Sequence, residues 1–309
     1  MLADRIRVVS GFESSRGVWI TSFMLTPNTI LVSKNLSNWN SVIIPFSGTK
    51  HISYLCYGNG IFLAISENGT QIATSTDGFN WNVINHIVAE TIRGLRFIDG
   101  LFYATGLSIS NPSRINTSPD GINWTTYNPS TILTDSLYDI VKAGNNIIVG
   151  GYDSDYINIL YISSSGLGGT FSSKDTKFTN TNKTVNTIET NNANTLIMIG
   201  GNGGEISTSV TGSSWTNRNN PFGAIRTIRF FKDKFIICDG NKLGYALDAT
   251  RYVITKDTGV VINQMNSAAM SEDLFVAGGT GKLYVTKDGI DWNDITLQSI
   301  PSFVTYNFP

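Results

Sequence analysis

The chain is poor in the residues from which most metal and nucleophilic sites are built. Its 309 residues include two cysteines, Cys56 and Cys238, and two histidines, His51 and His86. A structural zinc site needs four Cys or His ligands, commonly in closely spaced pairs, and no such pairing occurs here. We therefore expect no metal and no cofactor. Both cysteines are expected to be buried thiols, because free cysteine behaves as a small hydrophobe.

Charge and long apolar runs are also scarce. The chain has 22 Lys+Arg against 23 Asp+Glu, a net charge of -1, and 15% charged residues. This balance lacks the basic footprint that nucleic-acid binding requires. No apolar run reaches the 18 residues of a membrane span, and the first residues lack the apolar stretch of a secretory signal. We expect neither nucleic acid as a partner nor membrane insertion.

What the sequence does contain is a seven-residue phrase that recurs seven times and ends on an aromatic residue. The aromatic residues are Trp39, Trp81, Trp124, Phe171, Trp215, Tyr252 and Trp292. Their successive spacings are 42, 43, 47, 44, 37 and 40 residues. A period near 40 residues is typical of four-stranded propeller blades and is too long for a leucine-rich solenoid.

The repeats predict an all-β fold, a seven-bladed β-propeller of four-stranded antiparallel blades. Each repeat contains four short apolar or β-branched runs separated by Gly, Asn and Asp turns, as in the second repeat from His51 to Ile84. Because one meander cannot bury both of its faces, the blades must stack as one domain over 1–309. The expected blades are 1–44, 45–87, 88–130, 131–180, 181–220, 221–257 and 258–300.

The phrase itself has a local explanation. Where Asp precedes Gly, as at Asp77, Asp120 and Asp288, the glycine accepts a positive φ and the carboxylate accepts backbone N–H groups. The aromatic residue is expected on the fourth strand, packed between blades. One carboxylate per repeat cannot supply the converging oxygens that Ca²⁺ needs, so we interpret these aspartates as structural.

Ser-x-Asp-Gly-x-x-Trp resembles the Asp-box repeat of neuraminidase-type propellers, in a compact form with Asp and Gly adjacent. Seven copies cover essentially the whole chain, and three keep the Asp-Gly-x-x-Trp core. The resemblance implies the propeller fold. It leaves function open, because Asp-box propellers are similar to sialidases, photosystem assembly factors, sorting receptors and phage virion proteins alike.

Similarity to sialidases would imply arginines at the channel mouth that hold a substrate carboxylate. Arg93 and Arg226 lie where the first strands of the third and sixth repeats begin, and Arg96 and Arg229 follow three residues later. The guanidinium fork suits a carboxylate or phosphate. The alternative is that these arginines bind carbonyls or acids of adjacent blades. A Tyr/Glu catalytic pair is not visible, so we predict no catalytic residues and no enzyme activity.

Two loops depart from the repeat and complete the predicted binding surface. They connect the second and third strands of the third repeat, at 107–113, and of the fourth, at 152–156, and they should emerge on the face of the inner-strand arginines. Aromatic and polar loop residues suit sugar or protein contacts. The candidate binding residues are Arg93, Arg226, Arg114, Tyr152, Asp153, Asp155 and Tyr156.

These features predict a non-catalytic binding or assembly propeller. The preferred setting is a phage virion, as a tail, fibre or head-decoration protein that contacts other virion proteins or a host surface glycan; extracellular and cytoplasmic locations are the alternatives. Rival functions are a sialidase-type glycoside hydrolase and an intracellular assembly factor, and a homo-oligomer stays open. Residues 301–309 are predicted either to close the first blade or to pair with a neighbouring subunit.

Overall fold

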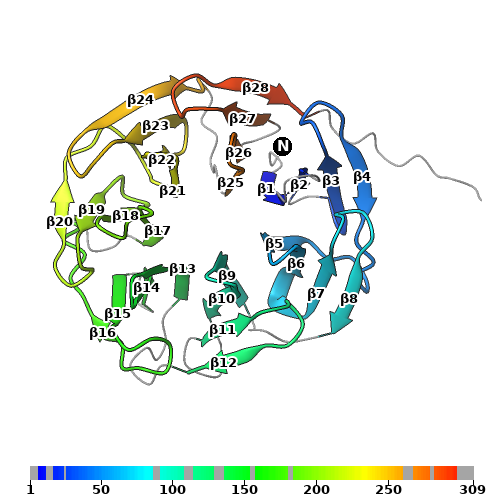
Figure 1. The fold of residues 1–309 in the computed structure, drawn as a ribbon, viewed down its shortest axis with the longest axis horizontal. Helices are drawn as coiled ribbons and strands as arrows, with labels where there is room; N and C mark the ends of the chain where they lie inside the picture. The colour runs from blue at the N-terminus through cyan, green and yellow to red at the C-terminus, as the bar shows by residue number, and fades with distance from the viewer. Residues whose placement is uncertain are drawn as a thin grey trace, which may run out of the picture.

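The computed structural model describes residues 6–11, 17–23, 26–85, 91–107, 114–128, 136–153, 157–179, 184–259, 267–278 and 282–297. In these residues the chain forms seven sheets of four antiparallel strands, which Figure 1 shows as blades around a central axis. The predicted fold class, a seven-bladed β-propeller, is confirmed. The segment 301–309 lies outside the described residues, as do Asp155 and Tyr156.

Every blade takes its four strands in chain order from the centre outward. The innermost strands are β1 (Ile6–Gly11), β5 (Ile52–Gly58), β9 (Thr91–Ile98), β13 (Ser136–Ala143), β17 (Val185–Thr190), β21 (Thr227–Phe231) and β25 (Ser267–Met270). The second strands are β2 (Val18–Phe23), β6 (Ile61–Ser66), β10 (Leu101–Leu107), β14 (Asn146–Tyr152), β18 (Ile197–Gly201), β22 (Lys234–Cys238) and β26 (Phe275–Gly278).

The third strands are β3 (Thr29–Ser33), β7 (Gln71–Ser75), β11 (Arg114–Ser118), β15 (Asn158–Ser163), β19 (Ile206–Ser209), β23 (Lys242–Ala246) and β27 (Lys282–Thr286). The outermost are β4 (Asn40–Ile43), β8 (Asn82–Asn85), β12 (Thr125–Tyr127), β16 (Ser172–Ser173), β20 (Thr216–Arg218), β24 (Tyr252–Asp257) and β28 (Asn293–Thr296). One short 3₁₀ turn, η1 (Glu67–Gly69), joins β6 to β7. Within the described ranges no helix is long and apolar enough to cross a membrane.

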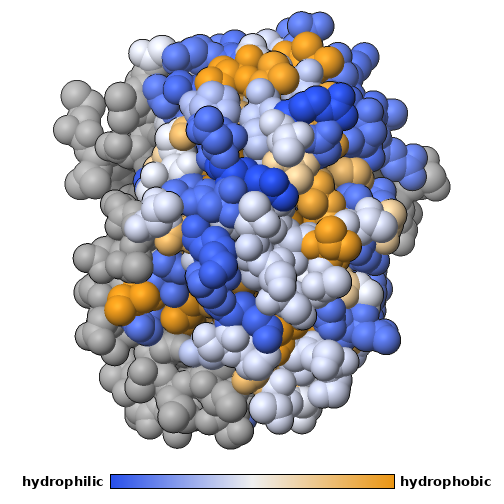
Figure 2. All heavy atoms as spheres, turned by 90° about the vertical axis from the view of Figure 1, so that its left-hand side faces the viewer, coloured by the Kyte–Doolittle hydropathy of each residue, from blue (hydrophilic) through white to orange (hydrophobic). Residues whose placement is uncertain are grey.

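Burial follows the position of a strand within its blade. Second strands such as β14 and β18 are almost continuously buried, because neighbouring blades cover both of their faces. Outer strands such as β4 and β28 are mostly exposed. Figure 2 shows one part of the outer side of the ring, the left-hand side of Figure 1, where hydrophilic residues predominate and apolar ones form separate patches. The outer wall is therefore the solvated side of each meander.

Among the described residues the core is divided into seven apolar clusters, one at each interface between neighbouring blades. The aromatic residue that ends each repeated phrase belongs to a different cluster, which explains why the phrase recurs once per blade. Trp19 and Leu31 of the first blade pack with Val276 and Leu283 of the seventh. This contact closes the ring through side-chain packing.

The Asp-Gly turns carry a repeated set of hydrogen bonds. In the third blade Asp120 Oδ1 accepts from the N–H groups of Ile122 and Asn123, both at 2.8 Å, while the Gly121 N–H donates to Ser118 Oγ at 2.9 Å. The indole of Trp124 donates to the Gly121 carbonyl at 3.0 Å. Gly121 has φ +72°, where a side chain would be strained. The turn is thus held by groups inside the phrase.

The seven aromatic residues were predicted on the fourth strand, and for six of them this is wrong by one residue. Trp81, Trp124 and Trp215 directly precede β8, β12 and β20, as Trp39, Phe171 and Trp292 precede β4, β16 and β28. In Trp81, Trp124 and Trp215 the reason is the bond from the indole to the turn glycine, which makes the ring part of the turn. Tyr252 alone begins its strand.

The two ends of the blades form two different faces of the ring. One face carries the hairpins between first and second strands together with the Asp-Gly turns between third and fourth strands, and we call it the turn face. We call the opposite face the loop face. Pairing of Leu107 with Thr91 places the start of β9 beside the end of β10, on the loop face. Pairing of Phe102 with Ser118 and Phe97 places the Asp120 turn at the other end. The start of β9, which carries Arg93, and the Asp120 turn therefore lie at opposite ends of the third blade.

Candidate functional site

The innermost strands share an irregularity near their loop-face ends. In the second to fifth blades the pairing with the next strand skips one residue, so that Ser53, Arg93, Tyr138 and Asn186 are extra residues in β5, β9, β13 and β17. Such bulges re-aim a side chain. Arg226 takes the corresponding place in the sixth blade, directly before Thr227, which pairs with Cys238. We call this the bulge position.

The residue after the bulge reaches the next blade. The Tyr54 hydroxyl donates to the Arg93 carbonyl at 2.6 Å. Asp139 Oδ2 accepts from the Ile188 N–H at 2.9 Å, and Thr187 Oγ1 accepts from the Ile228 N–H at 3.1 Å. These bonds satisfy backbone groups on the unpaired inner edges of the strands and tie the second, fourth and fifth blades to their successors.

In the third blade the residue after the bulge is Gly94. A glycine is needed there because the backbone of the fourth blade approaches it closely. A Cβ atom there would lie 2.4 Å from the Tyr138 carbonyl oxygen and 2.6 Å from Thr105 Oγ1. Only glycine therefore allows the third and fourth blades to meet at this point. The Arg93 and Tyr138 side chains are brought together by this contact.

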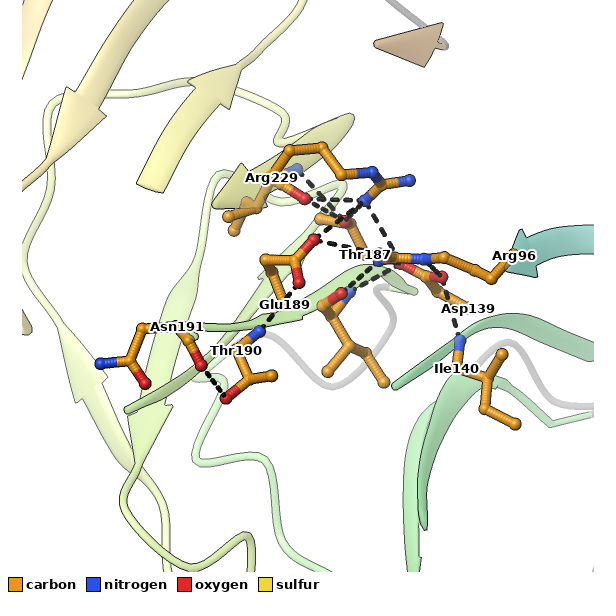
Figure 3. Close-up of polar contacts among 10 residues, drawn as sticks. Arg96, Asp139, Ile140, Thr187, Glu189, Thr190, Asn191 and Arg229 are labelled. Atoms are coloured by element: carbon orange, nitrogen blue, oxygen red, sulfur yellow. Dashed lines mark hydrogen bonds and ion pairs between the residues drawn. The ribbon is translucent and has the colours of Figure 1, made fainter. Parts of the chain in front are cut away.

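Deeper in the channel four charged residues form what we call the central network: Arg96, Asp139, Glu189 and Arg229. They come from β9, β13, β17 and β21, four successive blades (Figure 3). Arg96 Nε and Nη2 each lie 2.7 Å from one Asp139 oxygen, a bidentate pair, and Arg96 Nη1 lies 3.0 Å from Glu189 Oε2. Arg229 Nη1 is farther, 3.8 Å from Asp139 and 3.9 Å from Glu189.

Further bonds complete the network. Arg96 also donates to the Ile188 carbonyl, and Arg229 Nη1 donates to the Ile228 carbonyl at 2.7 Å. Burial disfavours charge on Asp139, yet the facing Arg96 and Arg229 guanidiniums hold its pKa below the usual range. Burial and the neighbouring Arg96 lower the pKa of Arg229. Two cations face two anions, so the network is neutral overall and holds both acids in ion pairs.

The predicted alternative for the inner-strand arginines, binding to acids and carbonyls of adjacent blades, therefore describes Arg96 and Arg229. Glu189 lies within β17 and faces both arginines. A general acid or base needs a proton position open to substrate. The Glu189 carboxylate instead accepts from Arg96 and, through Oε1, from the Thr190 N–H at 3.0 Å.

At the loop-face mouth of the channel a second group forms, which we call the mouth cluster: Tyr54, Arg93, Tyr138 and Tyr152. The Arg93 guanidinium carbon lies 5.7 Å from the centre of the Tyr138 ring, a cation–π contact. The Tyr138 and Tyr152 rings are 5.5 Å apart and tilted by 44°. Burial raises the pKa of Tyr138, and a hydrogen bond with Tyr152 adds to the rise although Arg93 opposes it.

Arg93 differs from the arginines of the central network because no acid faces it. Its Nε atom is buried and has no hydrogen-bond partner within the described residues, where it also forms no ion pair. Arg114 Nε is in the same condition. A buried N–H donor without an acceptor costs about 1–3 kcal/mol. Arg93 therefore carries a charge that no carboxylate among the described residues neutralises.

The structure brings only some of the predicted binding residues together. Arg93 and Tyr152 meet through Tyr138 at the junction of the third and fourth blades, whereas Arg226 lies in the sixth blade. Gly106 of β10 pairs with Arg114 on one side and with Ile92 on the other, so Arg114 and Ile92 share one face of the third blade. Ile92 belongs to the cluster between the second and third blades, so this face packs against the second blade. Arg93 turns the other way, toward Tyr138 of the fourth blade.

Asp153 serves its own loop. Its Oδ1 accepts from the Ile157 N–H at 2.9 Å, and its N–H donates to the Ile157 carbonyl at 3.0 Å.

Tyr138 and Tyr54 were missed from the sequence. The available signal was alignment of the inner strands, which places Tyr138 of SLYDIV at the position of Arg93 in TIRGLR. No group of three or more His, Cys, Asp or Glu in the described ranges could hold a metal ion.

Comparisons with known proteins bear on the fold alone. No family model matches the chain, and neither does any curated protein. Among solved structures it is similar to YCF48 bound to D1 peptide, with TM-score 0.65 and 11% identity over 90% of this chain and 91% of that one. It is also similar to the extracellular domain of a one component system from B. thetaiotaomicron, with TM-score 0.68 and 12% identity over 92% and 38%.

A third similar structure is PorZ, a bacterial surface component of the type-IX secretion system of Porphyromonas gingivalis. Its TM-score is 0.66 at 11% identity, over 98% of this chain and 39% of that one. Identities this low establish the β-propeller and nothing finer. A propeller fold suggests a binding or assembly role, because rigid blades present loops and strand ends on two broad faces.

Proposed function

We propose that this protein is a non-catalytic binding or assembly propeller and a structural component of a phage virion. In this role it is part of a tail, a fibre or the head decoration, and its loop face contacts other virion proteins or a host surface glycan. The single observation that carries the binding role is the division of the charged residues. The central network pairs its acids with arginines, whereas Arg93 at the mouth faces no acid in the described residues.

The same division argues against the sialidase-type alternative. That chemistry needs several open arginines and a carboxylate able to exchange protons with substrate or nucleophile. Asp139 and Glu189 each lie within ion-pair distance of two arginines, and the Arg96 guanidinium is paired with both acids. An oxyanion at Arg96 would have to displace these buried partners.

The virion setting rests on composition and on surface character. With 15% charged residues, the chain depends on Asn, Ser and Thr for solubility, and its outer strands present such residues at Ser41, Asn82, Thr125 and Thr216. Uncharged polar walls suit dense packing beside other proteins, where unpaired charges would be costly to bury.

Three measurements test the proposal. Mass spectrometry of density-purified phage particles should detect the chain in stoichiometric amount, and a glycan array or co-purification with virion proteins should show binding that Arg93→Ala together with Arg226→Ala weakens while far-ultraviolet circular dichroism stays unchanged. A fluorogenic sialoside should not be hydrolysed. Release of sialic acid that the same double substitution abolishes would favour the hydrolase instead.

A further inference from the structure

The junction between the seventh and first blades differs from the other six because the chain does not cross it. Each blade is built from four consecutive strands, so among the described residues no strand is shared between β1–β4 and β25–β28. An apolar cluster that contains Trp19 and Leu31 of the first blade and Leu283 of the seventh packs across the junction. Opening the ring at this place would therefore break no covalent connection.

The first blade presents an open edge and an exposed apolar side chain beside this junction. β4 is the last strand of its sheet, and its outer edge pairs with no strand of the described chain. Ile43, at its end, is 71% exposed, the highest value among the large apolar side chains of the described residues. Ile43 shares a face with Ser41, which pairs with Leu31 of the apolar cluster. The apolar surface of the junction thus continues outward to Ile43 along an edge that can accept a strand.

The chain leaves the described part of the ring at this same junction. Leu297 directly follows β28 and is buried in the cluster shared with the first blade. Thr296 pairs with the first residue of β27, and Ile43 pairs with the first residue of β3. Third strands begin on the loop face, so β28 and β4 both end there. A segment that continued from Leu297 and turned back along β4 would run antiparallel to it.

The sequence after β28 has the pattern of a strand with one apolar face. Residues 298–309 read QSIPSFVTYNFP, and none of them is charged. Val304, Tyr306 and Phe308 alternate with polar residues, which is the period of two expected for a half-buried strand. The link 298–303, when extended, can span up to about 20 Å. Pattern and length are both sufficient for a strand beside the first blade.

We infer that residues 302–308 pair antiparallel with β4 as a fifth strand of the first blade and fasten the seventh blade to the first. Val304 then lies opposite Ile43, and the apolar face of Val304, Tyr306 and Phe308 continues the apolar cluster of the junction outward. The sequence alone leaves pairing with a neighbouring subunit equally open. The common end of β4 and β28 on the loop face favours the first blade. The inference does not depend on the proposed virion function.

A second copy of the chain is a poorer occupant of this edge. The segment is joined to the buried Leu297 by a short link, so pairing within one chain requires no loss of translational freedom, whereas pairing between chains does. The β4 edge is also short, four residues, and offers few main-chain hydrogen bonds to offset that loss. Tethering therefore decides in favour of the segment's own ring.

Disulfide trapping in the whole protein tests the inference. Ile43→Cys combined with Val304→Cys places two thiols on opposed positions, where Cβ atoms lie about 4.5–5.5 Å apart and a disulfide forms after a small shift. Cys56 and Cys238 are buried and should not compete. After mild oxidation we expect an intrachain disulfide in most of the protein, seen as a monomer on a non-reducing gel and located by peptide mass spectrometry.

Val210→Cys together with Val304→Cys is the matched control. Val210 is 66% exposed and follows β19 of the fifth blade, so a thiol there is about as accessible as one at Ile43 but lies on another blade. This pair should give at least about tenfold less intrachain disulfide, because no tether brings its thiols together. Ile43→Cys with Thr305→Cys should also give less than with Val304→Cys, since neighbouring residues of a strand point to opposite faces.

Hydrogen exchange of variants without new cysteines gives an independent measurement. Thr305→Pro removes a backbone donor from the middle of the segment and disfavours its pairing. The amides of β4 should then exchange about tenfold faster than in wild type, while those of β20, an outer strand of the fifth blade, keep their wild-type rates. A chain that ends at Ile300 should behave in the same way, with far-ultraviolet circular dichroism confirming that the ring is folded.

Three results would overturn the inference. An interchain disulfide through Ile43→Cys would assign the β4 edge to a neighbouring subunit. Intrachain yields that are equal for Ile43→Cys and Val210→Cys, or absent for Ile43→Cys, would show that the segment has no fixed place on the first blade. Unchanged exchange of β4 in both Thr305→Pro and the shortened chain would show that the segment does not pair there. Each result would leave the proposed function standing, because that is tested by glycan and virion-protein binding.

Discussion

Arg93 and Arg96 lie three residues apart on β9, yet their surroundings differ completely. Arg96 forms a bidentate pair with Asp139 and a second pair with Glu189, and its side chain is 12% exposed. Arg93 contacts the Tyr138 ring and faces no acid within the described residues. The difference comes from what neighbouring blades supply at two levels of the channel, acids at the centre and tyrosines at the mouth.

This contrast separates the structural use of arginine in the central network from the binding use that we propose for Arg93. A buried cation is tolerated when acids and carbonyls compensate it, and the central network does this with residues of four blades. At the mouth no acid among the described residues compensates Arg93, and in the proposed function a ligand does so. Repeat architecture makes such a comparison informative, because corresponding positions share their backbone geometry and differ only in side chains.

The largest expected effect comes from breaking the central network. Asp139→Ala leaves Arg96 and Arg229 with one acid between them and removes the acceptor of the Ile188 N–H. We expect a loss of about 3–5 kcal/mol in the free energy of unfolding, the usual consequence of removing one partner of a buried ion pair. Urea unfolding measures it, with the slope checked for two-state behaviour.

The control for this prediction is Asp175→Ala, which removes an exposed acid paired with Lys177. Exposed pairs contribute about 0.2–1 kcal/mol, so this variant should differ little from wild type. If Asp139→Ala and Asp175→Ala had equal effects, the central network would not stabilise the ring, and the contrast between the two levels of the channel would lose its basis.

The apolar interfaces provide the next test. Trp124→Ala removes a partly buried ring from the cluster between the second and third blades, and Trp215→Ala removes a 5% exposed ring between the fourth and fifth. We expect about 3 kcal/mol for Trp124, at the lower end of large-to-small substitutions, and more for Trp215. Thermal unfolding of both variants decides the order; a greater loss for Trp124 would contradict this assignment of burial.

The Asp-Gly turns should matter less. Asp120→Ala removes the acceptor of the Ile122 and Asn123 N–H groups, and we expect a loss of about 1 kcal/mol. Asp120→Asn should cost less, because Asn35 in the first blade already accepts from Ser37 and Asn38 in the same way. Chelator treatment should leave the melting temperature of the wild type unchanged; unfolding by chelator would show that the turns bind metal.

These turns also predict a dependence on pH. Burial opposes ionisation of Asp77, but bonds from Asn80, Phe79 and Ser75 lower its pKa from 3.8 to about 2. Since the folded pKa lies below the unfolded one, the stabilisation is complete above about pH 4 and disappears as the pH falls toward 2. Asp77→Asn should therefore lose less stability than wild type between pH 4 and pH 2. Parallel acid titrations of unfolding that coincided would contradict this.

The sequence predicts the fold well because each blade is specified locally. The Asp120-Gly121 turn and Trp124 bond within one phrase, so a pattern of seven residues already contains their geometry. The central network is different, since Arg96 meets Asp139 and Glu189 at separations of 43 and 93 residues. No single repeat contains both partners.

The residues of the mouth cluster were predicted only in part, because their contacts also join different repeats. Arg93 was visible as a repeated arginine, but Tyr138 becomes meaningful only once the bulge aligns β9 with β13. The bulges themselves depend on how β10 and β14 pair with these strands, through Gly106 and Gly151, and the sequence pattern does not encode such register shifts.

The smallest expected effect on stability is that of Arg93→Gln, and it is the sharpest test of the contrast between the two levels. The substitution removes a cation–π contact of about 0.5–1 kcal/mol and also removes a buried donor whose lack of an acceptor costs about 1–3 kcal/mol. These contributions oppose each other, so the free energy of unfolding should change by less than about 1 kcal/mol in either direction. Arg96→Gln, measured beside it in urea, should be destabilised by several times that amount, because it leaves Asp139 and Glu189 buried with only the more distant Arg229. Equal losses in the two variants would mean that Arg93 is compensated within the protein after all, and its availability to a ligand would have to be abandoned.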